Sequence, residues 1–180
     1  MSLERLAELL RERNRISSEI ATLLGRPALS SHIGEYIASK IFDVELYESA
    51  THKGADGQFR SGPLRGKTVN VKLYGKKEGI LDVNHAPADY YLVLTGPDSP
   101  PTSSRGGDRP LTIEQAFIFN MKKLLTELKG RGVKIGIATS IKKGEWEKTM
   151  IYPYPTNTEY TMSPEQKKQL ELFIGATSQP

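Results

Sequence analysis

The segment 90–95 restricts the fold of this chain more than any other part of the sequence. Its residues, Tyr-Tyr-Leu-Val-Leu-Thr, form a short and continuous apolar run. Runs of this kind are typical of strands that are buried on both faces of a sheet. A strand buried in this way needs a packed layer on each side, so the run predicts an α/β sandwich in which helices cover a mixed sheet.

Periodicity and turn residues predict the remaining elements. Leucine and isoleucine at helical spacing predict one or two helices over 3–24. Isoleucines at the same spacing predict a further helix over about 32–42, with Ser31 as its N-cap. Thr112 and Gln115 form a capping box that predicts a helix to about residue 129, and Ser163 begins the last helix, which ends near residue 175. The expected strands are 44–47, 55–60, 67–74, 90–95, 133–138 and 146–152, with a long Gly-, Pro- and Ser-rich loop over 96–110. We therefore expect an N-terminal helical extension over 1–28 and one α/β domain over 29–180.

Composition narrows the classes of protein that the chain can represent. It has 180 residues and no cysteine, which excludes disulfides and thiolate zinc sites. No apolar run is long enough for a membrane span, and the first residues lack the apolar core of a signal peptide. We expect a soluble, cytoplasmic protein with no membrane partner. The net charge of +4 is compatible with a polyanionic partner but does not require one.

Four polar side chains are candidates for a site. The segment 68–73 alternates, so its aliphatic residues share one face of a strand while Asn70 and Lys72 share the other. Asp56 lies on the preceding expected strand, and Glu35 lies on the helix before the strands. Carboxylate and amide oxygens are the ligands that Mg²⁺ prefers, and a lysine beside such a metal acts as a point charge on water or phosphate. Asp56, Lys72 and Glu35 also have purely structural interpretations, as a turn residue, a solvent-facing lysine and a residue that favours the positive end of its helix.

With these residues, segment 31–140 resembles the PD-(D/E)xK nuclease superfamily, which has the restriction-endonuclease-like fold. In that family a core helix, which often carries a glutamate, precedes a three-stranded meander. An acidic residue lies on the second strand and an acid-x-Lys pair on the third. The His-Ile-Gly-Glu sequence at 32–35 and the segment 90–97 are also similar to those of small bacterial proteins of this fold. The resemblance implies a Mg²⁺- or Mn²⁺-dependent nuclease, with Asp56, Asn70 and Glu35 as metal ligands and Lys72 assisting the attacking water.

One position departs from the family pattern. Asn70 stands where the motif usually has Glu or Asp, and an amide oxygen can coordinate a metal but brings no charge. Glu35, Glu78 and Asp82 are the candidates for a compensating carboxylate. The departure favours, as an alternative function, a non-catalytic nucleic-acid-binding or complex-forming module that retains the nuclease fold.

DNA is the expected partner, and basic residues near the site are candidates to contact its phosphates, with an ordinary solvated surface as the alternative. These residues are Lys53, Arg60, Arg65, Lys67, Lys76, Lys77, Arg105 and Arg109. The leucine stripe of the first helix is suited to a homodimer and equally to packing on the domain itself. A third hypothesis is a helix-turn-helix regulator that reads DNA through residues 16–42, because Ala21 and Gly25 have the spacing of that motif.

Overall fold

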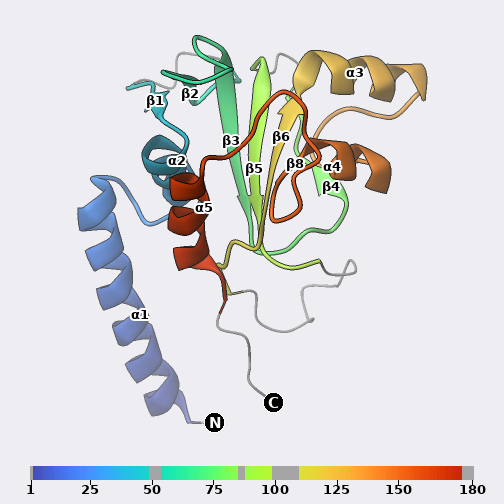
Figure 1. The fold of residues 1–180 in the computed structure, drawn as a ribbon. Coiled ribbons are helices and arrows are strands. Elements are labelled where there is room, and N and C mark those ends of the chain that lie inside the picture. The colour runs from blue at the N-terminus through green and yellow to red at the C-terminus, as the bar shows by residue number, and fades with distance from the viewer. Residues whose placement is uncertain (1, 49–53, 85–87, 99–109, 176–180) are drawn as a thin grey trace.

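The computed structural model describes residues 2–48, 54–84, 88–98 and 110–175 (Figure 1). Lys53, Arg105, Arg109 and most of the loop expected over 96–110 lie outside these ranges. The helices are α1 (Leu3–Leu24), α2 (Ser30–Ile41), α3 (Met121–Gly130), α4 (Lys143–Thr149), α5 (Pro164–Leu170) and the short 3₁₀ helix η1 (Glu171–Phe173). The strands are β1 (Val44–Leu46), β2 (Gly57–Phe59), β3 (Thr68–Tyr74), β4 (Ile80–Leu81), β5 (Tyr90–Thr95), β6 (Gln115–Asn120), β7 (Thr139–Ser140) and β8 (Met150–Tyr152).

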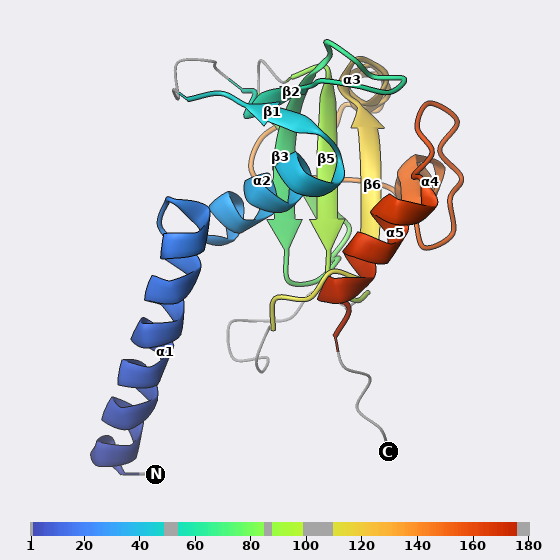
Figure 2. The same ribbon diagram turned by 60° about the vertical axis from the view of Figure 1, so that its left-hand side comes forward.

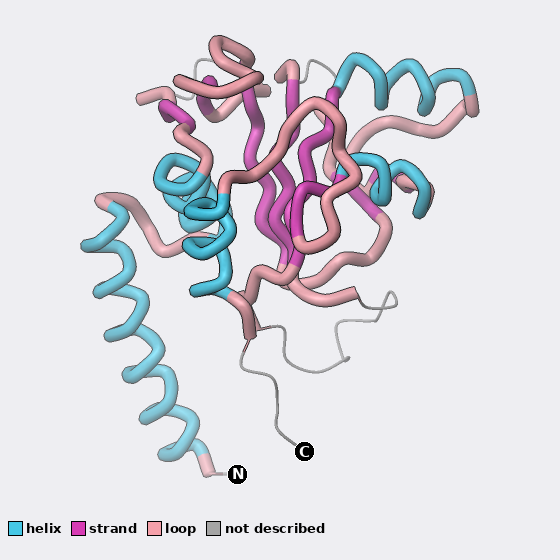
Figure 3. Tube along the Cα trace, in the orientation of Figure 1, coloured by secondary structure: helices cyan, strands magenta, loops and turns pink. Residues whose placement is uncertain are grey.

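Six strands form one mixed sheet in the order β1-β2-β3-β5-β6-β8 (Figures 1 and 3). The first three strands make an antiparallel meander. β5 then lies parallel to β3, and β6 and β8 follow in antiparallel pairing. β4 and β7 pair separately as a small antiparallel ladder. The observed fold is therefore a mixed α/β sheet flanked by helices, and β3 and β5 are among its central strands.

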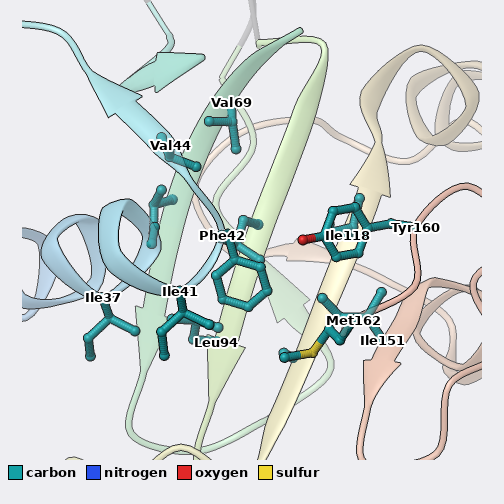
Figure 4. Packing of buried hydrophobic residues seen from close by; sticks show 14 of the residues in the cluster. Ile37, Ile41, Phe42, Val44, Val69, Leu94, Ile118, Ile151, Tyr160 and Met162 are labelled. Carbon is teal, nitrogen blue, oxygen red and sulfur yellow. The ribbon is translucent and has the colours of Figure 1, made fainter. Parts of the chain in front are cut away.

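Each face of the sheet packs against its own hydrophobic layer. On one face, Val69 and Leu92 belong to a cluster that includes Ile37 and Ile41 of α2 (Figure 4). On the opposite face, Tyr91 and Val93 belong to a cluster with α3 and α4, in which the indole of Trp146 contacts Phe117 and Phe119 edge to face. Burial on both faces explains why all six residues of β5 are buried.

The first half of the chain follows the sequence predictions closely. α1, the first three strands and β5 lie within one or two residues of their expected positions. The N-cap of α2 is a correction, because the helix begins at Ser30 with Leu29 as the cap residue, two positions before the predicted Ser31. Leu29 makes no side-chain capping bond. At the other end of the chain, Ser163 caps α5 as predicted.

The helix predicted from the Thr112–Gln115 capping box is wrong. Residues 115–120 form β6, and the helix begins only at Met121, where the Asn120 side chain accepts a hydrogen bond from the Lys123 amide. The run Ala-Phe-Ile-Phe at 116–119 is buried on both faces of the sheet, as a strand with a packed layer on each side allows. Pairing with β5 therefore overrides the local helix signal.

Two strands predicted near the C-terminal end are also corrected. Residues 133–138 form turns and loop rather than a buried strand, and the Ile137 side chain is 91 % exposed. The expected strand over 146–152 is divided between α4 and β8. β8 occupies the position beside β6 that a strand over 133–138 could have taken.

α1 projects away from the sheet and touches the domain near its C-terminal end, where it contacts α2 (Figures 1 and 2). None of its residues is buried. It ends at Gly25, whose φ of 67° is the left-handed conformation that favours glycine. Among the described residues, no helix combines the length and apolar character that a membrane crossing requires.

Candidate functional site

The candidate site lies along β3, whose alternation places its two polar residues on one face. Val69 and Val71 join the layer beneath α2, so Asn70 and Lys72 point to the opposite face, as predicted. Asn70 is only 5 % exposed, and its side-chain oxygen has no hydrogen-bond partner among the described residues. A buried amide oxygen without a partner is costly, so this atom is suited to a ligand that the described residues do not supply.

Asp56 lies directly before β2 and is held against the edge of β3. Its amide donates to the Val69 carbonyl at 2.9 Å, and its Oδ2 accepts a hydrogen bond from the Val71 amide at 2.7 Å. These two bonds bracket Asn70. No hydrogen bond within the described residues involves the other carboxylate oxygen, Oδ1. The fold therefore brings Asp56 and Asn70 together, although Asp56 lies just before β2 and not within a strand as predicted.

Burial is the main cause that raises the pKa of Asp56 above its ordinary value. The Val71 amide opposes this shift by donating to the ionised carboxylate, and repulsion from Glu35 adds to the increase. Attraction from Lys72 and Arg26 lowers the pKa again. Two of the other predicted site residues, Glu35 and Lys72, are therefore within electrostatic reach of Asp56.

α2, which carries Glu35, packs very closely on β3. At Gly34, an added side-chain carbon would stand only 2.9 Å from Cβ of Leu73, so glycine is what permits the approach. The Glu35 side chain is 14 % exposed and forms an ion pair with Arg26. Arg26, in the connection between α1 and α2, is a site residue that the sequence did not indicate, because nothing in the local sequence relates it to Glu35.

Lys72 lies over an aromatic ring rather than in an ion pair. Its Nζ is 5.6 Å from the ring centroid of Tyr91, which is fully buried. Within the described part of the chain, no carboxylate lies within the 4.0 Å ion-pair distance of Lys72. The Tyr91 hydroxyl accepts a hydrogen bond from the Asn84 amide, and its pKa is raised by burial first and then by the nearby Asp56 and Asp82 carboxylates. Tyr91, which sequence analysis treated only as a strand residue, forms the floor beneath Lys72.

The other two carboxylates considered as metal ligands are engaged elsewhere. Asp82 Oδ1 accepts a hydrogen bond from the Ala138 amide at 2.9 Å, and Glu78 pairs with Lys76 at 2.7 Å. Over the described ranges, no group of three or more His, Asp or Glu residues is arranged to hold a metal. A cation at this site would therefore depend on Glu35 and Asp56 together with the neutral oxygen of Asn70.

Only some of the predicted basic residues are available to contact an anion. Arg60 pairs with Asp43, and Lys77 pairs with Asp98. Arg65 and Lys67, on the turn between β2 and β3, are exposed and form no ion pair within the described residues. Because the described residues do not neutralise these two cations, the turn between β2 and β3 can present positive charge to an anion.

A second polar cluster, which sequence analysis missed, ties β5 to the segment after β8. Glu159 accepts hydrogen bonds from the Tyr90 hydroxyl at 2.7 Å and from Asn120 Nδ2 at 3.0 Å. Burial alone would raise the pKa of Glu159, but these bonds and the one from Lys123 outweigh it and lower the pKa to about 2. Both oxygens of this carboxylate accept hydrogen bonds, so the cluster is a structural clamp across 69 residues of sequence.

Comparison with known proteins adds no family to this description. No protein-family model matches the chain, and the curated proteins contain no match to it.

Proposed function

We propose that the chain is a metal-dependent, nuclease-like hydrolase that acts on the phosphodiester bonds of DNA. The observation that carries this proposal is the pair of free oxygens at the edge of β3. Among the described residues, Asn70 Oδ1 is buried without a hydrogen-bond partner, and Asp56, whose Oδ2 accepts a bond from the amide of Val71, the residue after Asn70, has no hydrogen bond to its Oδ1. Two uncommitted oxygens next to a lysine suit a hard cation and a phosphate better than they suit a packed core.

The order of elements supports the same proposal. A core helix, α2, precedes the antiparallel meander of β1, β2 and β3. Glu35 lies on that helix, Asp56 at the start of the second strand, and Asn70 and Lys72 on the third. This arrangement is the one expected of a restriction-endonuclease-like domain with the PD-(D/E)xK site.

In this proposal each residue of the site has a distinct role. Asp56, Asn70 and Glu35 would hold Mg²⁺ or Mn²⁺, and the cation, when bound, supplies positive charge against the phosphate and makes water more acidic. Lys72, which lies over Tyr91 and has no ion pair within the described residues, stabilises the negative charge that develops on the phosphate. Glu35 must exchange Arg26 for the cation, and the released guanidinium is then free to bind a neighbouring phosphate.

A cleavage assay tests the proposal. We expect the purified chain to nick supercoiled plasmid DNA in Mg²⁺ or Mn²⁺, and we expect Asp56→Asn and Lys72→Met to reduce the rate at least about 100-fold, because each removes a charge that acts on the transition state. Lys122→Met is the matched control, because Lys122 is an exposed lysine on α3 with no ion pair in the described chain. Circular dichroism establishes that the variants fold. Equal cleavage by all four proteins would remove these residues from the mechanism.

A non-catalytic nucleic-acid-binding or complex-forming module is the second candidate. Two observations favour it: position 70 brings no charge, and Glu35 is already neutralised by Arg26. Binding of DNA that persists in EDTA, together with no cleavage in any divalent cation, would establish this alternative. The helix-turn-helix hypothesis has less support, because residues 16–24 continue a single helix and α2 packs its buried face on the sheet.

A further inference from the structure

α1 presents a long apolar surface that no described part of the chain covers. Large apolar side chains are exposed along its whole length, including Leu3 at 80 %, Leu9 at 47 %, Ile16 at 44 % and Leu23 at 69 %. A helix of 22 residues with no buried residue has little stability of its own in water, so its stability depends on a partner surface.

The apolar residues of α1 follow a seven-residue repeat for three heptads. Nearly all of the apolar side chains lie at four of the seven positions of the repeat. Two of these are core positions, and the other two flank the core. The core positions hold Leu3, Leu10, Ser17 and Leu24 in one series and Leu6, Arg13 and Ile20 in the other. The flanking positions hold Leu9, Ile16 and Leu23 on one side and Ala7, Asn14 and Ala21 on the other. All four glutamates of the helix and its other three arginines lie on the opposite face, which is the pattern of a coiled-coil strand.

We propose that α1 pairs with α1 of a second copy of this chain in an antiparallel coiled coil. Arg13 favours the antiparallel direction. In a parallel, in-register pair the two copies of Arg13 would meet in the same core layer, where like charges repel. In an antiparallel pair centred on residue 15, each core residue i faces residue 30 − i, and Arg13 meets Ser17 of the second copy.

The antiparallel register also matches the apolar residues to one another. Leu6 meets Leu24 of the second copy, and Leu10 meets Ile20, so both ends of the interface are apolar. In this register, the residues of one flanking series lie beside residues of the same series in the second copy. Leu9 is then next to Leu23 along one flank, and the small side chains of the alanines meet along the other, which lets the helices approach closely. Ile20 and Leu24 are already half-buried near the domain, so the exposed N-terminal half of one helix would complete the cover over them.

The charges of α1 argue against the other occupants of an apolar helix face. The helix has four glutamates and four arginines, so its net charge is zero. Helices that bind anionic membrane surfaces, or track DNA phosphates, carry an excess of Lys and Arg on the polar face. On α1 that face is instead crossed by its own ion pairs, such as Arg5 with Glu8 and Arg15 with Glu12.

Sedimentation equilibrium of the full chain tests the pairing. We expect a species of twice the chain mass of 20.0 kDa. Leu10→Glu should raise the dissociation constant at least about 100-fold, because every dimer would bury two unpaired carboxylates. Ser18→Glu is the matched control, because it adds the same charge on the polar face and should leave the mass unchanged. A chain that is monomeric at every concentration tested, or a dimer that Leu10→Glu does not weaken, would overturn the proposal, as would a monomer that binds anionic vesicles through α1.

Spin labelling tests the direction of the helices. The chain has no cysteine, so Glu4→Cys provides one label on the polar face of α1. Residue 4 lies level with residue 26 in the antiparallel register, so the two labels should lie about 33 Å apart along the axis, which is 22 residues at 1.5 Å each. A separation of about 10–12 Å, one helix diameter, would show a parallel pair and overturn the register. Both experiments are independent of DNA cleavage.

Discussion

Gly34→Ala probes the closest approach between α2 and the sheet. The added carbon would stand 2.9 Å from Cβ of Leu73 and 3.6 Å from Cγ1 of Val71. Cβ of Leu73 cannot swing away, because it is attached directly to the backbone of a central strand. Overpacking of this kind costs about 1–3 kcal/mol, while replacing a helical glycine by alanine gains about 0.5–1 kcal/mol. We expect Gly34→Ala to lower the free energy of unfolding by about 1–2 kcal/mol.

Gly144→Ala supplies the matched control for this substitution. Gly144 is also helical, in α4, but an added carbon there meets nothing within 4 Å. It should therefore stabilise the chain by about 0.5–1 kcal/mol, and guanidinium unfolding with equal m-values measures both variants. The difference between the two variants isolates the contact with Leu73. If Gly34→Ala were as stable as Gly144→Ala, α2 would not lie close to β3, and the electrostatic interaction of Glu35 with Asp56 would lose its basis.

Two further predictions concern the charges of the site. Arg26→Gln should tighten Mn²⁺ binding, measured by calorimetry, because it frees the Glu35 carboxylate and removes a competing positive charge; weaker binding would show that Arg26 positions Glu35 rather than blocks it. The raised pKa of Asp56 means that the folded state holds its proton more tightly than the unfolded state, so this residue costs stability as the pH rises above its unfolded pKa. Asp56→Asn should therefore stabilise the chain at pH 7 and have little effect at pH 3, and equal effects at both pH values would contradict the burial of Asp56.

The sequence predicted the parts of the fold in which the local residue pattern and the pairing with distant strands favour the same structure. The alternation of segment 68–73 placed Asn70 and Lys72 on one face, and the apolar run over 90–95 predicted a strand buried on both faces. Predictions from local signals were wrong where the pairing of distant strands determines the secondary structure. The capping box at Thr112 was consistent with a helix, but the segment after it lies antiparallel to β5 and completes the core of the sheet. A run of four consecutive apolar residues at 116–119 was the signal against an amphipathic helix.

The candidate site was predictable for the residues of the strands and not for the residues that surround them. Asp56, Asn70 and Lys72 belong to adjacent segments of the meander, so strand pairing alone brings them together. Arg26 and Tyr91 come from elements whose packing the local sequence does not encode. Arg26 reaches Glu35 only because the connection after α1 turns back toward α2, and Tyr91 lies beneath Lys72 only because β5 runs parallel to β3.

The central claim is that the free oxygens of Asp56 and Asn70 bind one hard cation. Anomalous diffraction from a crystal of this protein soaked in Mn²⁺ tests it most directly. We expect one peak within about 2.0–2.6 Å of Asp56 Oδ1 and Asn70 Oδ1, the range of hard cation–oxygen bonds, and we expect the peak to be absent in Asp56→Asn. Saturating Mn²⁺ with no peak there, and with the Asn70 oxygen bonded to another protein group, would contradict the account.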